Sequence, residues 1–290
     1  MVLAGATLWG LSGTAAQVLL HQNHISANWL VSIRMLVSGV VLVCWSIVRL
    51  RGQLSALLRD KSAWTGIAVF AIVGLWGVQL TYFKAIAAGN AASATLLQYL
   101  GPPMIVAWLA MRDRRSPGAP SLTALALSLA GTMLLVTGGQ VGKLAVPLNA
   151  VLWGLLSALC LVFYTLQPLP LIRRYGAVTI VGWGMLLGGM AASAFTPFWH
   201  VPAALQSHPS TLLLTAFIVL FGTLAAFTLY LSSLRHLTPS ETGLMATAEP
   251  ISAVGASLIF LHVHLAPLQM IGAAAIVAAI IRLSWQKRRS

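Results

Sequence analysis

Long apolar blocks separated by short polar connections make up nearly the whole chain. The blocks are about 20 residues long, which is the length a helix needs to cross roughly 30 Å of hydrocarbon at 1.5 Å per residue. We therefore predict an all-α integral membrane protein with ten transmembrane helices. The predicted spans cover residues 2–20, 29–50, 63–88, 91–111, 121–138, 148–170, 177–198, 210–235, 241–261 and 267–283.

Composition agrees with this pattern. Of the 290 residues, 59% are hydrophobic and only 7% are charged, whereas soluble domains carry roughly 25% charged residues. So few charges cannot cover a water-facing surface, which excludes a soluble globular protein. Cys44 and Cys160 both fall inside predicted spans, where we expect no disulfide.

The basic residues alternate between the connections, and this alternation predicts the topology. Fourteen of the 17 Lys and Arg residues fall on one side of the predicted membrane, and Lys143 alone falls on the other. Because basic connections stay cytoplasmic during insertion, both termini and the connections 51–62, 112–120 and 171–176 are predicted to be cytoplasmic. The outward connections are then 21–28, 139–147, 199–209 and 262–266. The fourteen residues are Arg49, Arg51, Arg59, Lys61, Arg112, Arg114, Arg115, Arg173, Arg174, Arg235, Arg282, Lys287, Arg288 and Arg289.

The net charge of +13 therefore reflects membrane orientation, and we expect no nucleic-acid partner. The partners predicted are the lipid bilayer of the cell inner membrane and a small-molecule substrate. The sequence does not determine an oligomeric state.

An internal repeat divides the chain into two halves. The letters LWGL occur at residues 8–11 and again at 152–155, and the segment 82–102 aligns without gaps with 230–250 at an offset of 148. The halves are predicted to be 1–140 and 141–290, each with five spans. Because five is odd, the second half enters the membrane in the opposite sense, as in secondary transporters that rock about a central cavity. The alternative is a chance match between residues that are common in membrane helices.

Prolines occur at corresponding depths in the two halves. Pro102 and Pro103 lie about ten residues into the fourth span and Pro250 about nine into the ninth, roughly 15 Å from the membrane surface. Each proline removes a helical hydrogen bond and frees a carbonyl. We interpret these prolines as helix breaks that line a cavity and take part in gating; the alternative is a simple packing kink.

At these residues the sequence resembles the EamA-type ten-helix permeases of the drug/metabolite transporter superfamily. The resemblance rests on LWGLSG in the first span, Arg34 in WLVSIRML, the segment YFKAIAAGNAASATLL before Pro102, and Glu249–Pro250 in AEP. It implies a small-metabolite transporter, with amino-acid exporters of the YddG type as the nearest subgroup. It also implies that the fifth and tenth spans lie outside the cavity.

Ionisable groups inside spans cost at least about 2.5 to 3.5 kcal/mol at a helix centre, so each requires a reason. Glu249 lies about eight residues into its span. We predict that it contacts a substrate amine or carries a coupling proton; the alternative is a neutral acid bonded to a neighbouring helix. Arg34 is predicted either to face the interior or to extend to the membrane surface, and Lys84 to extend to the surface.

The remaining candidates are aromatic and amide side chains that could shape a weakly polar cavity, although Trp and Tyr also occur at membrane interfaces. With the ionisable residues, the predicted substrate-binding set is Trp9, Ser12, Gln17, Arg34, Gln79, Tyr82, Gln98, Tyr99, Trp153, Tyr164, Trp183, Tyr230 and Glu249. The glycines of GWGMLLGG (182–189) are interpreted as close-packing residues between helices.

An integral-membrane enzyme is the competing class of function. It would need clustered His, Asp or Glu residues, but the chain has four acids in all, and His262–Val263–His264 is a lone pair of histidines. We therefore predict no metal site and no cofactor, and because no Walker motif is present we predict no ATP-driven transport. A drug, nucleoside or sugar-derivative transporter coupled to protons is the alternative substrate assignment. A channel or a structural membrane protein does not account for the mirrored halves.

Overall fold

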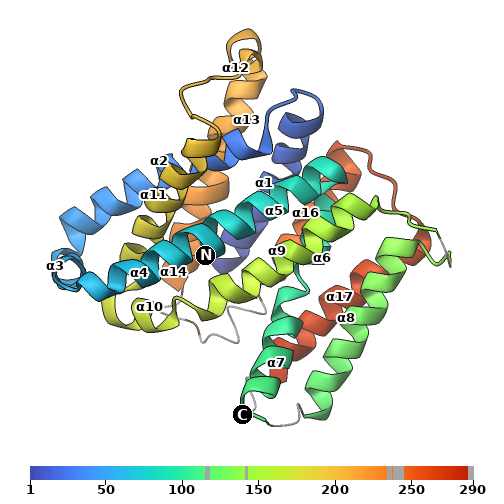
Figure 1. Ribbon diagram of the computed structural model, residues 1–290. Helices are drawn as coiled ribbons and strands as arrows, with labels where there is room; N and C mark the ends of the chain where they lie inside the picture. Colours follow the sequence, from blue (N-terminus) through green and yellow to red (C-terminus); the bar gives the residue numbers. More distant parts are fainter. Residues whose placement is uncertain (115–117, 141–142, 234–236, 238–244, 287–290) are drawn as a thin grey trace.

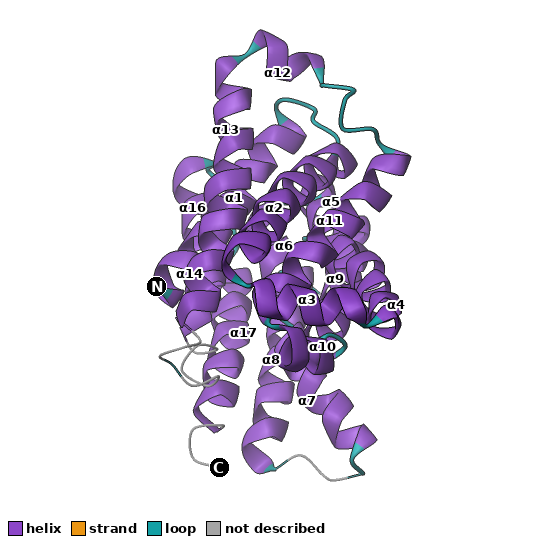
Figure 2. Cartoon of the chain, turned by 90° about the vertical axis from the view of Figure 1, so that its left-hand side faces the viewer, coloured by secondary structure: helices purple, strands orange, loops and turns teal. Residues whose placement is uncertain are grey.

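The computed structural model describes residues 1–114, 118–140, 143–233, 237 and 245–286, and this part of the chain is helical, with no strand (Figures 1 and 2). Eight helical segments in it are long and apolar enough to cross a membrane. They are Val2–His21 (α1), Ala27–Arg49 (α2), Lys61–Ala88, Ala91–Arg112, Leu148–Tyr175, Ala177–Phe195 (α11), Pro209–Tyr230 and Pro267–Ser284, the last within α17 (Pro267–Gln286).

Two further apolar helices are shorter, α8 (Ala119–Thr137) and α16 (Ala248–Phe260). Each of the ten predicted spans overlaps one of these ten segments. The all-helical membrane class is thus confirmed, whereas the count of ten spans stays a prediction because only eight segments have the required length. Glu241, Arg115, Arg235 and the basic residues 287–289 lie outside the described residues.

Several of the long segments are composite. Their parts are α4 (Lys61–Val69), η1 (Phe70–Trp76) and α5 (Gly77–Ala88); α6 (Ala91–Gln98) and α7 (Gly101–Arg112); α9 (Leu148–Leu166) and α10 (Leu169–Tyr175); and α13 (Pro209–Val219), η2 (Leu220–Ala225) and α14 (Ala226–Ser233). The basic connection after the second span is itself helical, because α3 (Arg51–Arg59) buries Leu54 and Leu57 against the bundle. The short helix α12 (Ala203–Ser207) lies at the opposite end of the molecule from α3 and α10 (Figure 2).

The helices pack in pairs that correspond between the two halves. The second and seventh spans, α2 and α11, run along each other, as do the fifth and tenth, α8 and α17, which lie together at one side of the bundle (Figure 1). The sixth span, α9, packs against α5 and α6 of the third and fourth spans. The first span, α1, packs against α14 and α16 of the eighth and ninth. Exchanging the two halves therefore maps one set of contacts onto the other.

Glycines bring the paired helices into close contact. A Cβ atom added at Gly189 of α11 would lie 2.8 Å from the backbone nitrogen of Leu36 in α2. A Cβ atom added at Gly131 of α8 would lie 2.6 Å from the carbonyl oxygen of Gly272 in α17. Without hydrophobic driving force between helices in lipid, such close backbone approach is a main source of their association. The packing role predicted for the glycines of GWGMLLGG agrees with these contacts.

Irregular turns also occur at corresponding places. The third span contains the π-helix η1 at 70–76, and adding the offset of 148 gives 218–224, which overlaps η2 at 220–225. The fourth span is interrupted at Tyr99–Leu100, just before Pro102 and Pro103 at the start of α7. In the ninth span residues 245–246 are helical, Thr247 forms a turn, and Pro250 lies in the first turn of α16.

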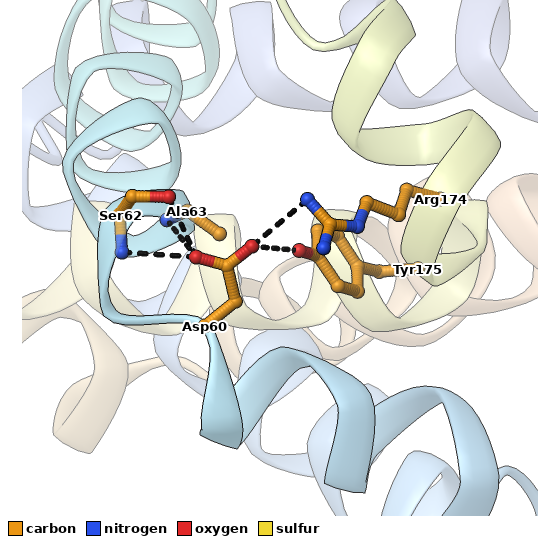
Figure 3. Close-up of polar contacts among 5 residues, drawn as sticks. All are labelled: Asp60, Ser62, Ala63, Arg174 and Tyr175. Carbon is orange, nitrogen blue, oxygen red and sulfur yellow. Dashed lines mark hydrogen bonds and ion pairs between the residues drawn. The ribbon is translucent and has the colours of Figure 1, made fainter.

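A polar cluster around Asp60 joins the two halves at the end of the bundle that carries α3 and α10 (Figure 3). One carboxylate oxygen caps α4 by accepting hydrogen bonds from the backbone and hydroxyl of Ser62 and from the backbone of Ala63. The other accepts the Tyr175 hydroxyl at 2.6 Å and pairs with Arg174 at 2.9 Å. The hydrogen bond from Ser62, then that from Tyr175, lowers the pKa of Asp60 to about 2. This carboxylate therefore holds α4 against α10.

Candidate functional site: a central cavity

A cavity of about 560 Å³ lies between the helices. Both halves contribute to its wall, through residues of α1, α2, α5, α6, α7, α9, α14 and α16 among others. Eleven residues predicted from the sequence line it: Trp9, Ser12, Arg34, Gln79, Tyr82, Gln98, Tyr99, Pro102, Tyr164, Tyr230 and Glu249.

The cavity extends toward the end of the bundle that carries α3 and α10, which we call the basic end because Arg173 and Arg174 lie there. Its lining includes Leu169 and Ile172 of α10, next to Arg173 and Arg174, and Leu283 and Ser284 near the C-terminal end of α17. The expectation that the fifth and tenth spans stay outside the cavity is therefore wrong for α17. This helix reaches the wall because it packs along α8 (Figure 1) and beside α7, which itself contributes Pro102, Ile105 and Val106 to the lining.

Glu249 is held by a tyrosine from the other half. The Tyr99 hydroxyl lies 2.8 Å from Glu249 Oε2 and 2.9 Å from the carbonyl oxygen of Ala246. Tyr99 is available there because the fourth span breaks at this residue, while Glu249 lies in the first turn of α16 after the corresponding break. The two interrupted spans thus meet at the cavity through one hydrogen-bonded pair.

Arg34 of α2 is the cation of the cavity, and its side chain is positioned by two contacts. Its Nε donates to Thr223 Oγ1 at 3.1 Å, and its guanidinium lies 5.0 Å from the centroid of the Phe83 ring. Thr223 belongs to η2 and donates its own hydroxyl to the carbonyl of Ile218, five residues earlier, at 2.9 Å. Arg34 is 6% exposed, so the interior position was the correct one of the two predicted for it.

Aromatic rings form much of the remaining wall. Trp9 packs against Phe227 at 5.1 Å and against Tyr230 at 5.2 Å between ring centroids. Tyr164 stacks on Phe70 at 5.6 Å. Such rings give a large apolar surface with a few polar edges, which suits an organic ligand that must bind and then leave.

Polar groups on α5 and α6 complete the lining. The Tyr82 hydroxyl lies 2.8 Å from Thr95 Oγ1, and Gln98 donates to Ser157 Oγ at 2.7 Å. Neither amide atom of Gln79 has a hydrogen-bond partner within the described part of the chain, although both are buried. A buried amide without partners is costly, so Gln79 is a group that a ligand or a rearrangement would satisfy.

Five predicted residues lie away from the cavity. Gln17 accepts the backbone N–H of Ala91 at 2.8 Å and so caps α6, and Trp183 packs edge-on against Trp64 at 5.0 Å. Trp153 lies in a separate hollow of about 410 Å³, and Pro103 and Pro250 are buried in the first turns of their helices.

Trp153 also explains the position of Lys84, whose Nζ lies 4.7 Å from the Trp153 ring. The hollow that they share is lined by Ser26 and Asn28 at the start of α2, on the outward side of the predicted topology. Lys84 lies on the face of α5 opposite Gln79 and Tyr82, because five and two residues correspond to rotations of about 140° and 200°.

Several residues of the cavity wall are not among the candidates predicted from the sequence. Phe227 is the most informative, because the offset of 148 pairs it with Gln79, just as it pairs Tyr230 with Tyr82. Applying the repeat offset to every candidate would have identified it. The same offset pairs Thr165 with Gln17, whereas Ile172 and Ser284 carry no such signal, since they become part of the wall only through the way in which α10 and α17 approach the cavity.

The site combines one buried cation, one carboxylate and an aromatic wall. Arg34 and Glu249 both line it, yet they form no ion pair, since the only two in the described ranges are Arg112–Asp113 and Arg174–Asp60. Three or more His, Cys, Asp or Glu side chains do not come together as a metal site anywhere in the same ranges. The arrangement suits a small organic molecule with polar ends.

A multi-spanning helical bundle with an interior polar cavity is the architecture of a membrane transporter. The chain belongs to the EamA-like transporter family, whose model matches it twice, over residues 1–137 and 148–285. The uncharacterized inner membrane transporter YicL of Salmonella typhimurium is 36% identical over 289 residues, covering 99% of this chain and 95% of YicL. A solved crystal structure of another protein, 20% identical, covers 99% of both chains with a TM-score of 0.61, so the fold is shared with it.

Proposed function

We propose that this transporter exports small zwitterionic metabolites, and amino acids in particular, across the inner membrane. The observation that carries the proposal is the cavity itself, in which a carboxylate and a guanidinium are both present and unpaired. A zwitterion presents both charges, so it would neutralise the site. A few oriented groups in an aromatic wall can hold such a ligand without making its release slow.

The proposed mechanism is alternating access between two inverted five-helix repeats. Three observations support this mechanism: the helix contacts that correspond between the two halves, the two π-helices, and the two interrupted spans. The family model also matches the chain twice. With the basic end in the cytoplasm, the cavity extends toward the cytoplasm in this conformation. The inner-membrane location follows from the name of the YicL relative.

The repeat also accounts for Trp153. It corresponds to Trp9 through the LWGL match, but an inverted repeat places the two residues toward opposite ends of the membrane. Trp9 lines the central cavity, whereas Trp153 lines the separate hollow on the outward side of the predicted topology. We propose that Trp153 joins the wall when the transporter opens outward.

The second candidate function is export of drugs or other metabolites coupled to protons, with Glu249 as the proton carrier. Glu249 lines the cavity, and only one of its two carboxyl oxygens bonds to a described side chain, Tyr99. A proton on the other oxygen would be exchanged through the cavity, which a proton carrier requires.

Transport in proteoliposomes tests the proposal. The purified chain would be reconstituted with a mixture of labelled amino acids inside or outside, and counterflow measured without any added gradient. Uptake above that of protein-free vesicles for at least one zwitterion supports the assignment. Counterflow of nucleosides or cationic drugs with none for amino acids would contradict it and favour the second candidate.

A further inference from the structure

The guanidinium of Arg34 has more hydrogen-bonding capacity than the protein uses. An arginine carries five N–H donors, and only Nε has a partner, Thr223 Oγ1. No described residue bonds to the two terminal nitrogens. Neither nitrogen is among the fully buried polar atoms that lack a partner, so both are accessible, and Arg34 lines the cavity.

Arg34 also forms no ion pair with a described residue. The residue is 6% exposed, and its immediate neighbours are a hydroxyl and an aromatic ring. Of the three described acids, Asp60 pairs with Arg174 and Asp113 pairs with Arg112, far from this residue. Glu249 lines the same cavity and interacts with Arg34 electrostatically, but the two form no ion pair. A buried ion without a directly bonded counter-ion is destabilising, and in a membrane such a residue marks a ligand path by default.

The contacts of Arg34 hold the side chain without neutralising it. The hydroxyl proton of Thr223 is committed to Ile218, so the oxygen of Thr223 can only accept from Arg34 Nε. The Phe83 ring lies against the guanidinium. A planar guanidinium fixed at one edge and supported on an aromatic ring presents its free donors as a fork, which matches the two oxygens of a carboxylate.

We infer that Arg34 is the carboxylate-binding residue of the cavity and that the transported molecule carries a carboxylate. This inference rests on the proposed function and narrows it. With Glu249 facing the positive end of the ligand, the two residues fix its direction in the cavity. Molecules that have an amine but no carboxylate are then poor ligands, because binding them would leave Arg34 buried and unpaired.

Binding to the full chain in lipid nanodiscs tests the inference by calorimetry. Two matched pairs are used as probes: phenylalanine against phenylalaninol, and 3-phenylpropionate against 3-phenylpropanol. We expect the wild type to prefer the acid of each pair by roughly tenfold to a hundredfold, as for a hydrogen bond to a charged group. Arg34→Gln should bind acid and alcohol within about twofold of each other, and Arg34→Lys should keep a reduced preference.

Lys84→Gln is the matched control, since it also removes a cation that lies inside a span over an aromatic ring, but one that does not line the cavity. It should leave the preference for acids unchanged. If Arg34→Gln weakened the acid and the alcohol equally, the arginine would be structural and the inference wrong.

The design separates the inference from the proposed function. Wild-type protein that shows no preference for either acid, including protein that binds neither, would overturn the carboxylate assignment even if no variant folded. An Arg34-dependent preference for 3-phenylpropionate without transport of any amino acid would support the carboxylate site and contradict the amino-acid assignment. Amino-acid counterflow together with equal binding of acid and alcohol would support the amino-acid assignment and contradict the carboxylate site at Arg34.

Discussion

Replacing Glu249 by Gln removes the negative charge of the cavity while keeping the shape of the side chain. In the structure, Glu249 Oε2 accepts the hydroxyl of Tyr99 at 2.8 Å, and no described residue bonds to Oε1. The free oxygen is thus available to a substrate ammonium. A hydrogen bond between charged groups contributes about 1.5–3 kcal/mol, so Glu249→Gln should weaken amino-acid binding by roughly 10- to 150-fold.

The assay combines binding in nanodiscs with two transport measurements in proteoliposomes, namely counterflow and accumulation driven by a pH gradient. If Glu249 binds the amine, both transport rates fall for all amino acids. If it carries the coupling proton, counterflow survives and only pH-driven accumulation is lost. These two outcomes discriminate between the two roles predicted for the acid.

Tyr99→Phe is the companion variant, because it keeps the carboxylate but removes the hydroxyl that positions it. It should weaken binding less than Glu249→Gln does. Wild-type binding and both wild-type transport rates in a folded Glu249→Gln protein would refute the reasoning and leave Glu249 as a packing residue.

Three further predictions concern the bundle itself. Gly131→Leu should lower the melting temperature in detergent, since its side chain would meet the Gly272 backbone; an unchanged melting temperature would show that α8 and α17 can separate at no cost. In intact cells, an impermeant thiol reagent should label a single cysteine introduced at 143 but not one introduced at 118; labelling at 118 would contradict the predicted topology. Asp60→Asn should loosen α4 from α10. Because the pKa of Asp60 is lowered to about 2, its stabilisation is fully present above the unfolded pKa of about 3.9 and is lost as the pH falls toward 2. The difference in melting temperature between wild type and Asp60→Asn should therefore be constant from pH 5 to 8, and a slope across that range would mean that a different group is responsible.

Hydropathy was sufficient to predict the helical class and the position of each apolar helical segment, because the length of an apolar block is set by the membrane. The repeat added the corresponding positions Tyr82 and Tyr230, both of which line the cavity. Sequence could not assign Gln17 and Trp183, because a polar or aromatic residue in a span looks the same whether it lines a cavity, caps a neighbouring helix or packs against another ring.

The same limit applies to contacts between distant segments. The pair Tyr99–Glu249 joins residues 150 positions apart, and Arg34–Thr223 joins residues 189 apart. Each pair depends on a local irregularity, a helix break in the first case and a π-helix in the second. Periodicity assumes a regular helix, so it cannot predict contacts that arise where the helix is irregular.

The π-helices η1 and η2 determine which side of the third and eighth spans faces the ligand. A π-helical turn closes its hydrogen bond over one more residue than an α-helical turn, and one residue corresponds to a rotation of about 100°. Every side chain that follows is therefore turned relative to an uninterrupted helix, including Gln79 and Tyr82 after η1 and Phe227 and Tyr230 after η2. Which side chains of these two spans face the cavity therefore depends on the π-helical turn as well as on which residues the spans contain. Deleting Val73, which does not line the cavity, would retain every lining residue in the sequence, yet turn Gln79 and Tyr82 away from the cavity.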